Sequence, residues 1–173
     1  MTEKNTPPDD ADRWIELLQL KKHPEGGYFR ETYRSEETID KEHLPERFSG
    51  SRSLSTAIYF LLKGNDFSAF HSIKQDELFH FYDGSSLTIH VIDSSGHYFK
   101  IKLGRNIKDG EVPQATVKAG WVFGASVNDS NSYSLVGATV APGFDFEDFE
   151  LLSRYHLIEI FPQHKNIIEK LTR

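Results

Sequence analysis

Short runs of alternating apolar and polar residues fill most of the chain, and clusters of Gly, Asn, Asp and Ser separate them. This pattern is typical of antiparallel β-hairpins, because successive side chains of a strand point to opposite faces of its sheet. The runs recur at the short spacings of a β-sandwich or β-barrel. The predicted strands are 28–34, 54–62, 67–73, 77–82, 87–92, 98–103, 115–117, 121–127 and 133–140. The pattern therefore predicts an all-β fold.

The two ends of the chain follow other patterns. Residues 1–10 are polar and are predicted to form a flexible tail, which a short helix with one apolar stripe follows. Residues 144–149 alternate Phe with acidic residues and are interpreted as a loop or short helix that closes one end of the barrel. Residues 155–160 are interpreted as a further strand, followed by a short helix. Residues 11–173 are thus predicted to form a single domain.

Composition narrows the class of protein. The 173 residues include 13 Phe and 7 Tyr but only one Met, which favours strands over helical bundles. The absence of cysteine excludes disulfides, thiolate catalysis and zinc sites built on Cys. The net charge of −6 gives no basis for binding a nucleic acid backbone, and no apolar run approaches the ~18 residues of a membrane span. We therefore expect a cytoplasmic protein that binds neither nucleic acid nor membrane.

His71 and Glu77 are the strongest candidates for chemistry. Strict alternation over 67–73 places His71 in a row with apolar neighbours. If this row faces a barrel interior, burial favours a neutral histidine and a protonated glutamate, whereas pairing of the two opposes both shifts. Such a pair either transfers a proton or only satisfies its own hydrogen bonds, and the sequence leaves both interpretations open.

Two further groups of polar and aromatic residues are candidates for ligand contacts. Alternation over 28–34 places Arg30 and Arg34 on one face, where they either meet a phosphate or carboxylate or remain solvated. His80 and Tyr82 follow Glu77 closely in sequence, and simple alternation places His80 on the face opposite to Glu77. Only a β-bulge would bring His80 to the same face as Glu77. The remaining histidines, including His23, are scattered, and no role is predicted for them.

The motifs of the chain resemble those of cupins. Gly64, His71, Ile73, Glu77 and Gly84 stand at the spacings of the first cupin motif, with Ile73 in place of the second metal-binding His. In the segment that resembles the second motif, Phe123 stands where the last His ligand would be. Four longer stretches, in the same order, resemble the small branch known as cupin family five, a domain of unknown function: 23–35, 68–71, 76–82 and 140–150.

This resemblance implies a double-stranded β-helix, the jelly-roll barrel of cupins, assembled as a homodimer with a pocket of sugar or nucleotide size. The branch is similar in fold to dTDP-4-dehydrorhamnose 3,5-epimerase-like proteins, whose catalytic base is a His on the strand where this chain has His71. No counterpart of their catalytic Tyr is identified, and Glu77 stands where their pocket uses a cation. The resemblance thus implies the place of the site and leaves its reaction open.

The leading hypothesis is a metal-independent cupin, without a cofactor, that binds a sugar or nucleotide sugar and epimerises or isomerises it. The hypothesis assigns catalysis to His71 and Glu77, with His71 as base, and ligand binding to His80, Tyr82, Arg30 and Phe123. A second hypothesis is a non-catalytic module that binds a ligand or supports assembly. A third is a metal-dependent enzyme that holds a divalent metal through His71, Glu77 and His80.

Overall fold

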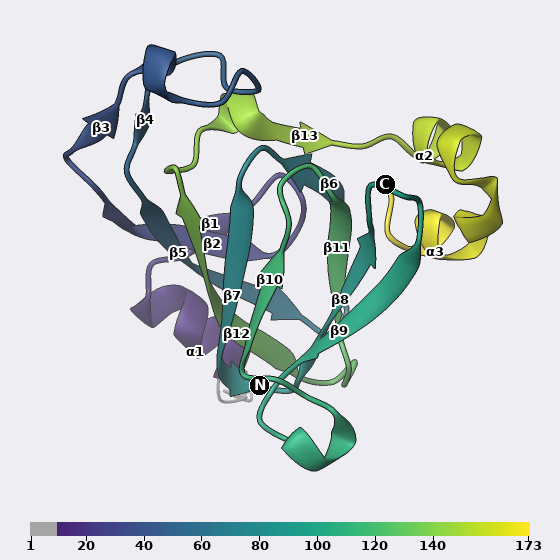
Figure 1. Cartoon of the computed structure of the whole chain (residues 1–173). Helices are drawn as coiled ribbons and strands as arrows, with labels where there is room; N and C mark the ends of the chain where they lie inside the picture. The colour runs from purple at the N-terminus through teal and green to yellow at the C-terminus, as the bar shows by residue number, and fades with distance from the viewer. Residues whose placement is uncertain (1–9) are drawn as a thin grey trace, which may run out of the picture.

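The computed structural model describes residues 10–173 as two antiparallel sheets that face each other (Figure 1). The larger sheet consists, in spatial order, of β1 (Lys21–Lys22), β2 (Tyr28–Arg34), β5 (Thr56–Lys63), β12 (Tyr133–Ala141), β7 (Asp76–Gly84) and β10 (Gln114–Val117). The smaller sheet consists of β13 (Phe149–Leu151), β6 (Phe67–Ile73), β11 (Val122–Val127), β8 (Leu87–Ile92) and β9 (Tyr98–Leu103). The predicted all-β jelly-roll barrel is confirmed.

The core lies between the two sheets, and alternation along the central strands builds it. Leu87, Ile89 and Val91 of β8 point inward and are fully buried, and they meet Val136, Ala138 and Val140 of β12 in one apolar cluster. Burial of each such side chain stabilises the fold by roughly 1.5–3 kcal/mol before entropy is counted. Nearly all the predicted strands of this core lie within two residues of their observed bounds, because hydrophobic period and turn residues agree there.

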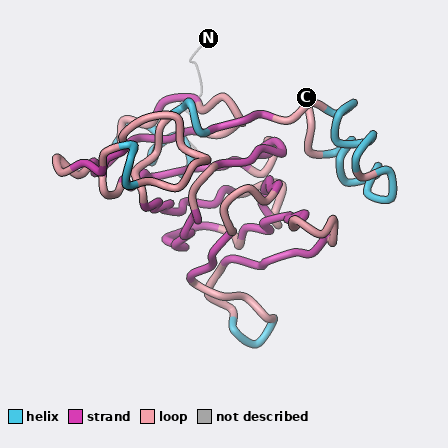
Figure 2. The backbone as a smooth tube through the Cα atoms, turned by 45° about the horizontal axis from the view of Figure 1, so that its top comes forward, coloured by secondary structure: helices cyan, strands magenta, loops and turns pink. Residues whose placement is uncertain are grey.

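The helices pack outside the sheets. The short N-terminal helix α1 (Asp10–Leu17) packs against β5 and β12 through Leu61 and Leu135. The C-terminal helices α2 (Arg154–Ile160) and α3 (Lys165–Lys170) lie together at one side of the strands (Figure 2). They cover the outer face of the smaller sheet through Phe70, Ile92, Leu157, Ile168 and Leu171.

The two ends of the chain differ from their predicted structure. The strand predicted over 155–160 is wrong, because these residues form α2, which Ser153 caps by accepting a hydrogen bond from the His156 amide. Of the predicted flexible tail, residues 1–9 lie outside the described residues, and Asp10 already belongs to α1. No helix within residues 10–173 is long and apolar enough to cross a membrane.

The polar connector before β5 contains more structure than its sequence indicates. It forms β3 (Thr38–Ile39), a 3-10 turn η1 (Lys41–His43) and β4 (Arg52–Ser53), and β3 pairs with β4. This segment lies at one end of the barrel, beside the 3-10 turn η3 (Phe146–Asp148) (Figure 1). Polar side chains that line an internal cavity lie at the same end of the barrel.

Candidate functional site

A cavity of about 270 Å³ lies between the sheets at this end of the barrel. Six phenylalanine side chains form most of its wall: Phe29, Phe60, Phe79, Phe144, Phe146 and Phe149. Four acid–base groups lie in its interior: His23, Glu25, His71 and Glu77. A mostly apolar wall with a few convergent polar groups is typical of a site for a small molecule.

A β-bulge in β6 determines which side chains of that strand enter the barrel. His71 pairs with Phe123 of β11 but Ser68 pairs with Ala125, so three steps on β6 match two on β11. The predicted single row through Phe67 and His71 is therefore wrong, because Phe67 packs outside against the C-terminal helices. Gly124 lies opposite the bulge, where a Cβ atom would come within 2.6 Å of the Ser68 carbonyl oxygen.

His71 is buried and is held in one tautomer. Its Nδ1 lies 2.7 Å from the carbonyl oxygen of Ala69, which can only accept a hydrogen bond, so Nδ1 carries the proton. Burial lowers the pKa of His71 to about 4, and the hydrogen bond to Ala69 offsets this only in part. At neutral pH the imidazole is therefore neutral, and its Nε2 is an acceptor.

Glu25 provides the partner of that acceptor. One of its carboxyl oxygens lies 3.2 Å from His71 Nε2, and the other accepts a hydrogen bond of 2.7 Å from the Ser68 hydroxyl. Burial raises the pKa of Glu25, although His23 and the hydrogen bond from Ser68 oppose the shift. When its carboxyl group is protonated, Glu25 donates to the neutral His71 across this contact.

The loop that carries Glu25 fits closely against β6. The Ala69 amide donates to the Glu25 carbonyl oxygen, and the Gly27 amide donates to an Asp66 carboxyl oxygen 3.1 Å away. Gly26 and Gly27 have φ values of +115° and +70°, and a Cβ atom on Gly26 would lie 2.2 Å from the Phe67 carbonyl oxygen. In the sequence, these glycines predict only the end of the preceding helix, and no role is predicted for Glu25. The acidic residue beside two adjacent glycines was the available signal.

Glu77 lies on β7 and faces the same cavity. Among the described residues, no hydrogen bond or ion pair involves its carboxyl group. Burial, with a further contribution from the nearby Glu25, raises the pKa of Glu77 to about 8. The predicted pairing of His71 with Glu77 is therefore not found, since His71 contacts Glu25 instead. At neutral pH Glu77 is a protonated carboxyl group without a protein partner.

A second bulge shapes the mouth of the cavity. Pairing of β2 with β5 shifts between Glu31 and Tyr33, so Glu31 and Arg34 both line the cavity. The predicted cationic face of β2 is broken at this point: Arg30 lies on the other face, with its guanidinium 5.9 Å from the centre of the Tyr59 ring. Arg34 forms two hydrogen bonds of 2.9 and 2.8 Å with Glu31.

Comparison with known proteins agrees with this architecture. Residues 12–152 match the family model described as "Cupin superfamily (DUF985)". The chain belongs to this cupin family.

Relatives match this cupin in sequence or in structure over most of their length. The uncharacterized protein YML079W of Saccharomyces cerevisiae is 35% identical over 156 residues, which cover 84% of this cupin and 77% of the yeast protein. The crystal structure of protein SO0799 from Shewanella oneidensis has 42% identity and a TM-score of 0.85, with 94% of this cupin and 97% of that chain covered. A hypothetical protein from Leishmania major has 35% identity and a TM-score of 0.84, with 94% and 98% covered.

The four predicted ligand-binding residues do not line the cavity of this cupin. They are Arg30, His80, Tyr82 and Phe123. His80 contacts Gln114 and Thr139, and the ring of Tyr82 packs against Tyr59. Phe123 packs against the His71 ring from the core, with ring centres 4.1 Å apart. Their role in ligand binding stays a prediction.

The donor set does not fit the metal that the cupin fold suggests. Within residues 10–173, no group of three or more His, Cys, Asp or Glu side chains is placed to hold a metal ion. His71 uses both nitrogens in contacts with Ala69 and Glu25, and the neighbouring positions Ile73 and Phe123 carry no donor atoms. We therefore derive no step through a metal.

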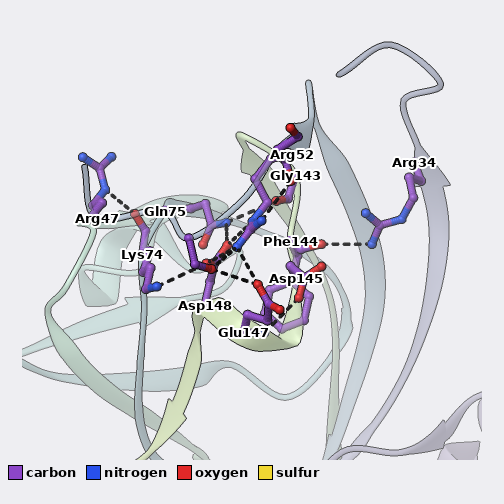
Figure 3. Close-up of polar contacts among 12 residues, drawn as sticks. Arg34, Arg47, Arg52, Lys74, Gln75, Gly143, Phe144, Asp145, Glu147 and Asp148 are labelled. Atoms are coloured by element: carbon purple, nitrogen blue, oxygen red, sulfur yellow. Dashed lines mark hydrogen bonds and ion pairs between the residues drawn. The ribbon is translucent and has the colours of Figure 1, made fainter. Parts of the chain in front are cut away.

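A segment from Gly143 to Phe149, here called the strap, closes one side of the cavity with Phe144, Phe146 and Phe149. Buried Asp148 anchors it by accepting two hydrogen bonds from Arg52, of 2.8 and 2.7 Å, and one of 2.7 Å from Gln75 (Figure 3). Burial alone would raise the pKa of Asp148, but these bonds outweigh it and hold the pKa below its usual value. The strap is thus fixed to β4 and to the turn between β6 and β7.

Proposed function

We propose that this cupin binds a small polar molecule in the barrel cavity and moves a proton on it, with the His71–Glu25 pair as base and Glu77 as acid. One observation carries the proposal: a carboxyl oxygen of Glu25 lies 3.2 Å from His71 Nε2, beside the carboxyl group of Glu77, which has no hydrogen-bond partner among the described residues. Titratable groups whose environments separate their protonation states are typical of acid–base sites.

The protons on His71, Glu25 and Glu77 allow a reaction that leaves the net charge of the site unchanged. Glu25 passes its proton to His71 Nε2 across the 3.2 Å contact and takes a proton from a ligand carbon next to a carbonyl group. Glu77 donates its proton to the carbonyl oxygen, which gives an enol. The site then holds one protonated histidine and one ionised Glu77, so its net charge is unchanged, and burial of an isolated charge is avoided. Return of the proton to the opposite face epimerises the ligand, and return to the neighbouring carbon isomerises it.

A sugar is the ligand class that we propose for this chemistry. Its hydroxyl and carbonyl oxygens match the convergent carboxyl groups, and the apolar face of a sugar ring matches the phenylalanine wall. The volume of about 270 Å³ is close to the lower limit of roughly 300 Å³ for small-molecule sites, which favours one monosaccharide unit. The epimerase or isomerase activity is part of the same proposal.

Deuterium incorporation tests this function. Glucose, fructose, mannose and rhamnose are incubated with the protein in D₂O, and NMR follows loss of the proton on the carbon next to the carbonyl. We expect exchange with the wild-type protein, and a loss of about 10²-fold or more in Glu77→Gln and His71→Asn, the usual size of a general acid–base contribution. The matched control is Glu159→Gln on α2, far from the cavity, which retains full exchange.

The outcome also separates catalysis from binding. A sugar that shifts the NMR signals of cavity residues but incorporates no deuterium would contradict the proposed catalysis. This result would favour a non-catalytic binding module. Unchanged exchange in Glu77→Gln would contradict the assignment of the acid.

A further inference from the structure

Charge is distributed unevenly around the cavity. Its interior holds two carboxyl groups, Glu25 and Glu77, and two histidines, His23 and His71. Burial lowers the pKa of both histidines, so neither supplies a positive charge at neutral pH. The interior therefore offers no cation to a ligand.

The mouth adds two further carboxylates and one cation. Glu31 and Asp145 line the cavity there together with Arg34. The Arg34 guanidinium is already engaged, because it donates twice to Glu31 and once, over 3.0 Å, to the Phe144 carbonyl oxygen. Anions in proteins are usually held by free guanidinium, ammonium or backbone N–H groups, and burial of an unpaired anion is costly. An anion in this cavity would meet carboxyl groups and phenyl rings.

Glu77 indicates which chemical group the cavity accepts. Its carboxyl group faces the cavity and, among the described residues, has no hydrogen-bond partner. A buried polar group of this kind gains from a ligand that completes its hydrogen bonds. A protonated carboxyl group donates its hydrogen to an acceptor oxygen of a ligand. The phenyl rings that line the cavity pack against an apolar surface of the same ligand.

We propose that the ligand group that enters the cavity is uncharged and presents an acceptor oxygen to Glu77, and that the cavity rejects anions. The inference rests on the proposed function only for the place of the ligand and requires no turnover. For a nucleotide sugar it means that the sugar enters and the diphosphate stays outside the cavity.

Three probes of one shape test the charge preference: benzyl alcohol, benzoate and benzylammonium. Titration of each into ¹⁵N-labelled protein at about pH 6 gives the dissociation constant from amide shifts of cavity residues. We expect benzyl alcohol to bind in the cavity and benzoate to bind at least about tenfold more weakly, because the carboxylate of benzoate loses its water there without gaining a free cation. Benzoate binding as tight as the alcohol, tightest binding of benzylammonium, or no cavity shifts with benzyl alcohol would each overturn the proposal.

A pH series tests the role of Glu77. Ionisation of Glu77 above its pKa of about 8 removes the donor, so benzyl methyl ether, whose oxygen can only accept a hydrogen bond, should bind several-fold more weakly at pH 9 than at pH 6. Glu77→Gln keeps a donor at every pH and should remove this dependence, whereas Asp145→Asn at the mouth should retain it. Persistence of the pH dependence in Glu77→Gln would contradict the assignment. Because these are binding measurements, their outcome is independent of whether deuterium exchange occurs.

Discussion

Burial sets the protonation of the three groups at the centre of the site. His71 and Glu77 shift in the directions expected for a histidine and a carboxyl group removed from water, toward the neutral forms. The sequence predicts these directions from the apolar neighbours of His71. It does not predict that Glu25 is the partner of His71, because Glu25 comes from a loop more than 40 residues earlier in the chain, and only the closed barrel brings the two together.

The raised pKa of Glu77 has a consequence for stability. In the unfolded chain its carboxyl group ionises near pH 4.5, but in the folded protein only near pH 8. Between these values folding requires uptake of a proton, so this group's contribution makes the fold less stable as pH rises from 4.5 to 8. Glu77→Gln should therefore increase the free energy of unfolding at pH 8, by about 1–2 kcal/mol after allowance for solvent in the cavity, and have a smaller effect at pH 5.

Urea denaturation of both proteins at the two pH values measures this difference. Glu159→Gln, on the exposed side of α2, serves as the control and should change neither value by more than about 0.5 kcal/mol. A loss of stability in Glu77→Gln at pH 8 would show that the carboxylate is stabilised in the folded protein, contrary to the raised pKa.

The two bulges show what alternation along an element does not predict. The sequence predicts the bounds of β2 and β6 correctly, because both are bordered by turn residues and rich in aromatic and β-branched side chains. One extra residue in each strand then moves side chains between faces, which brings Arg34 to the cavity, the Ser68 hydroxyl to Glu25 and Phe67 to the outside. Gly124 was the available signal, since a glycine within a strand often marks a close approach of backbone.

The strap is the element that depends most on one ionic contact. Asp148 is buried with Arg52, so Asp148→Asn leaves the guanidinium with only the exposed Glu147 as a counter-charge. Breaking a buried pair in this way costs about 3–5 kcal/mol. We expect Asp148→Asn to lower the free energy of unfolding by this order and to speed amide exchange in residues 143–149, as measured by hydrogen exchange and urea denaturation.

The neighbouring Glu147 is the matched control. It lies 3.5 Å from the same Arg52, but its side chain is 66% exposed, and an exposed ion pair contributes about 0–1 kcal/mol. Glu147→Gln should therefore leave both measurements nearly unchanged. Equal effects of the two substitutions would mean that burial of Asp148 is not what fixes the strap.

At the scale of the whole molecule, the barrel and the short helices α1 and α3 could be predicted, whereas α2 and the β3–β4 connector could not. Strand spacing and motif resemblance lead independently to the same jelly roll, because the core repeats one simple pattern. The pattern predicts a strand over 155–160 because Leu157, Ile158 and Ile160 form a short apolar run, and a run of this length does not distinguish a strand from a helix. Its helical form follows from the Ser153 cap and from packing of Leu157 on the outer face of the smaller sheet.

These outer helices also connect to the site. The Leu171 carbonyl oxygen accepts a hydrogen bond from the Phe70 amide, next to His71, and the Arg173 guanidinium donates to Asp66 over 2.8 Å. The other carboxyl oxygen of Asp66 accepts from the Gly27 amide, in the loop that carries Glu25. The C-terminal segment thus supports, through Asp66, the backbone that brings Glu25 to His71.

Arg173→Met tests this connection. Loss of the guanidinium should let the pKa of Asp66 rise, since burial raises it and the Arg173 hydrogen bond is the largest of the opposing contributions. The Gly27 amide should exchange about tenfold faster, which corresponds to a loss of about 1.4 kcal/mol in local protection, while amides of β8 remain unchanged. Lys165→Met is the control, because it removes an exposed pair with Glu169 on α3 and does not touch the loop. If Gly27 exchange and the Asp66 pKa, both measured by NMR, are the same in Arg173→Met and wild type, then the loop is held by its glycines and its contacts with β6 alone.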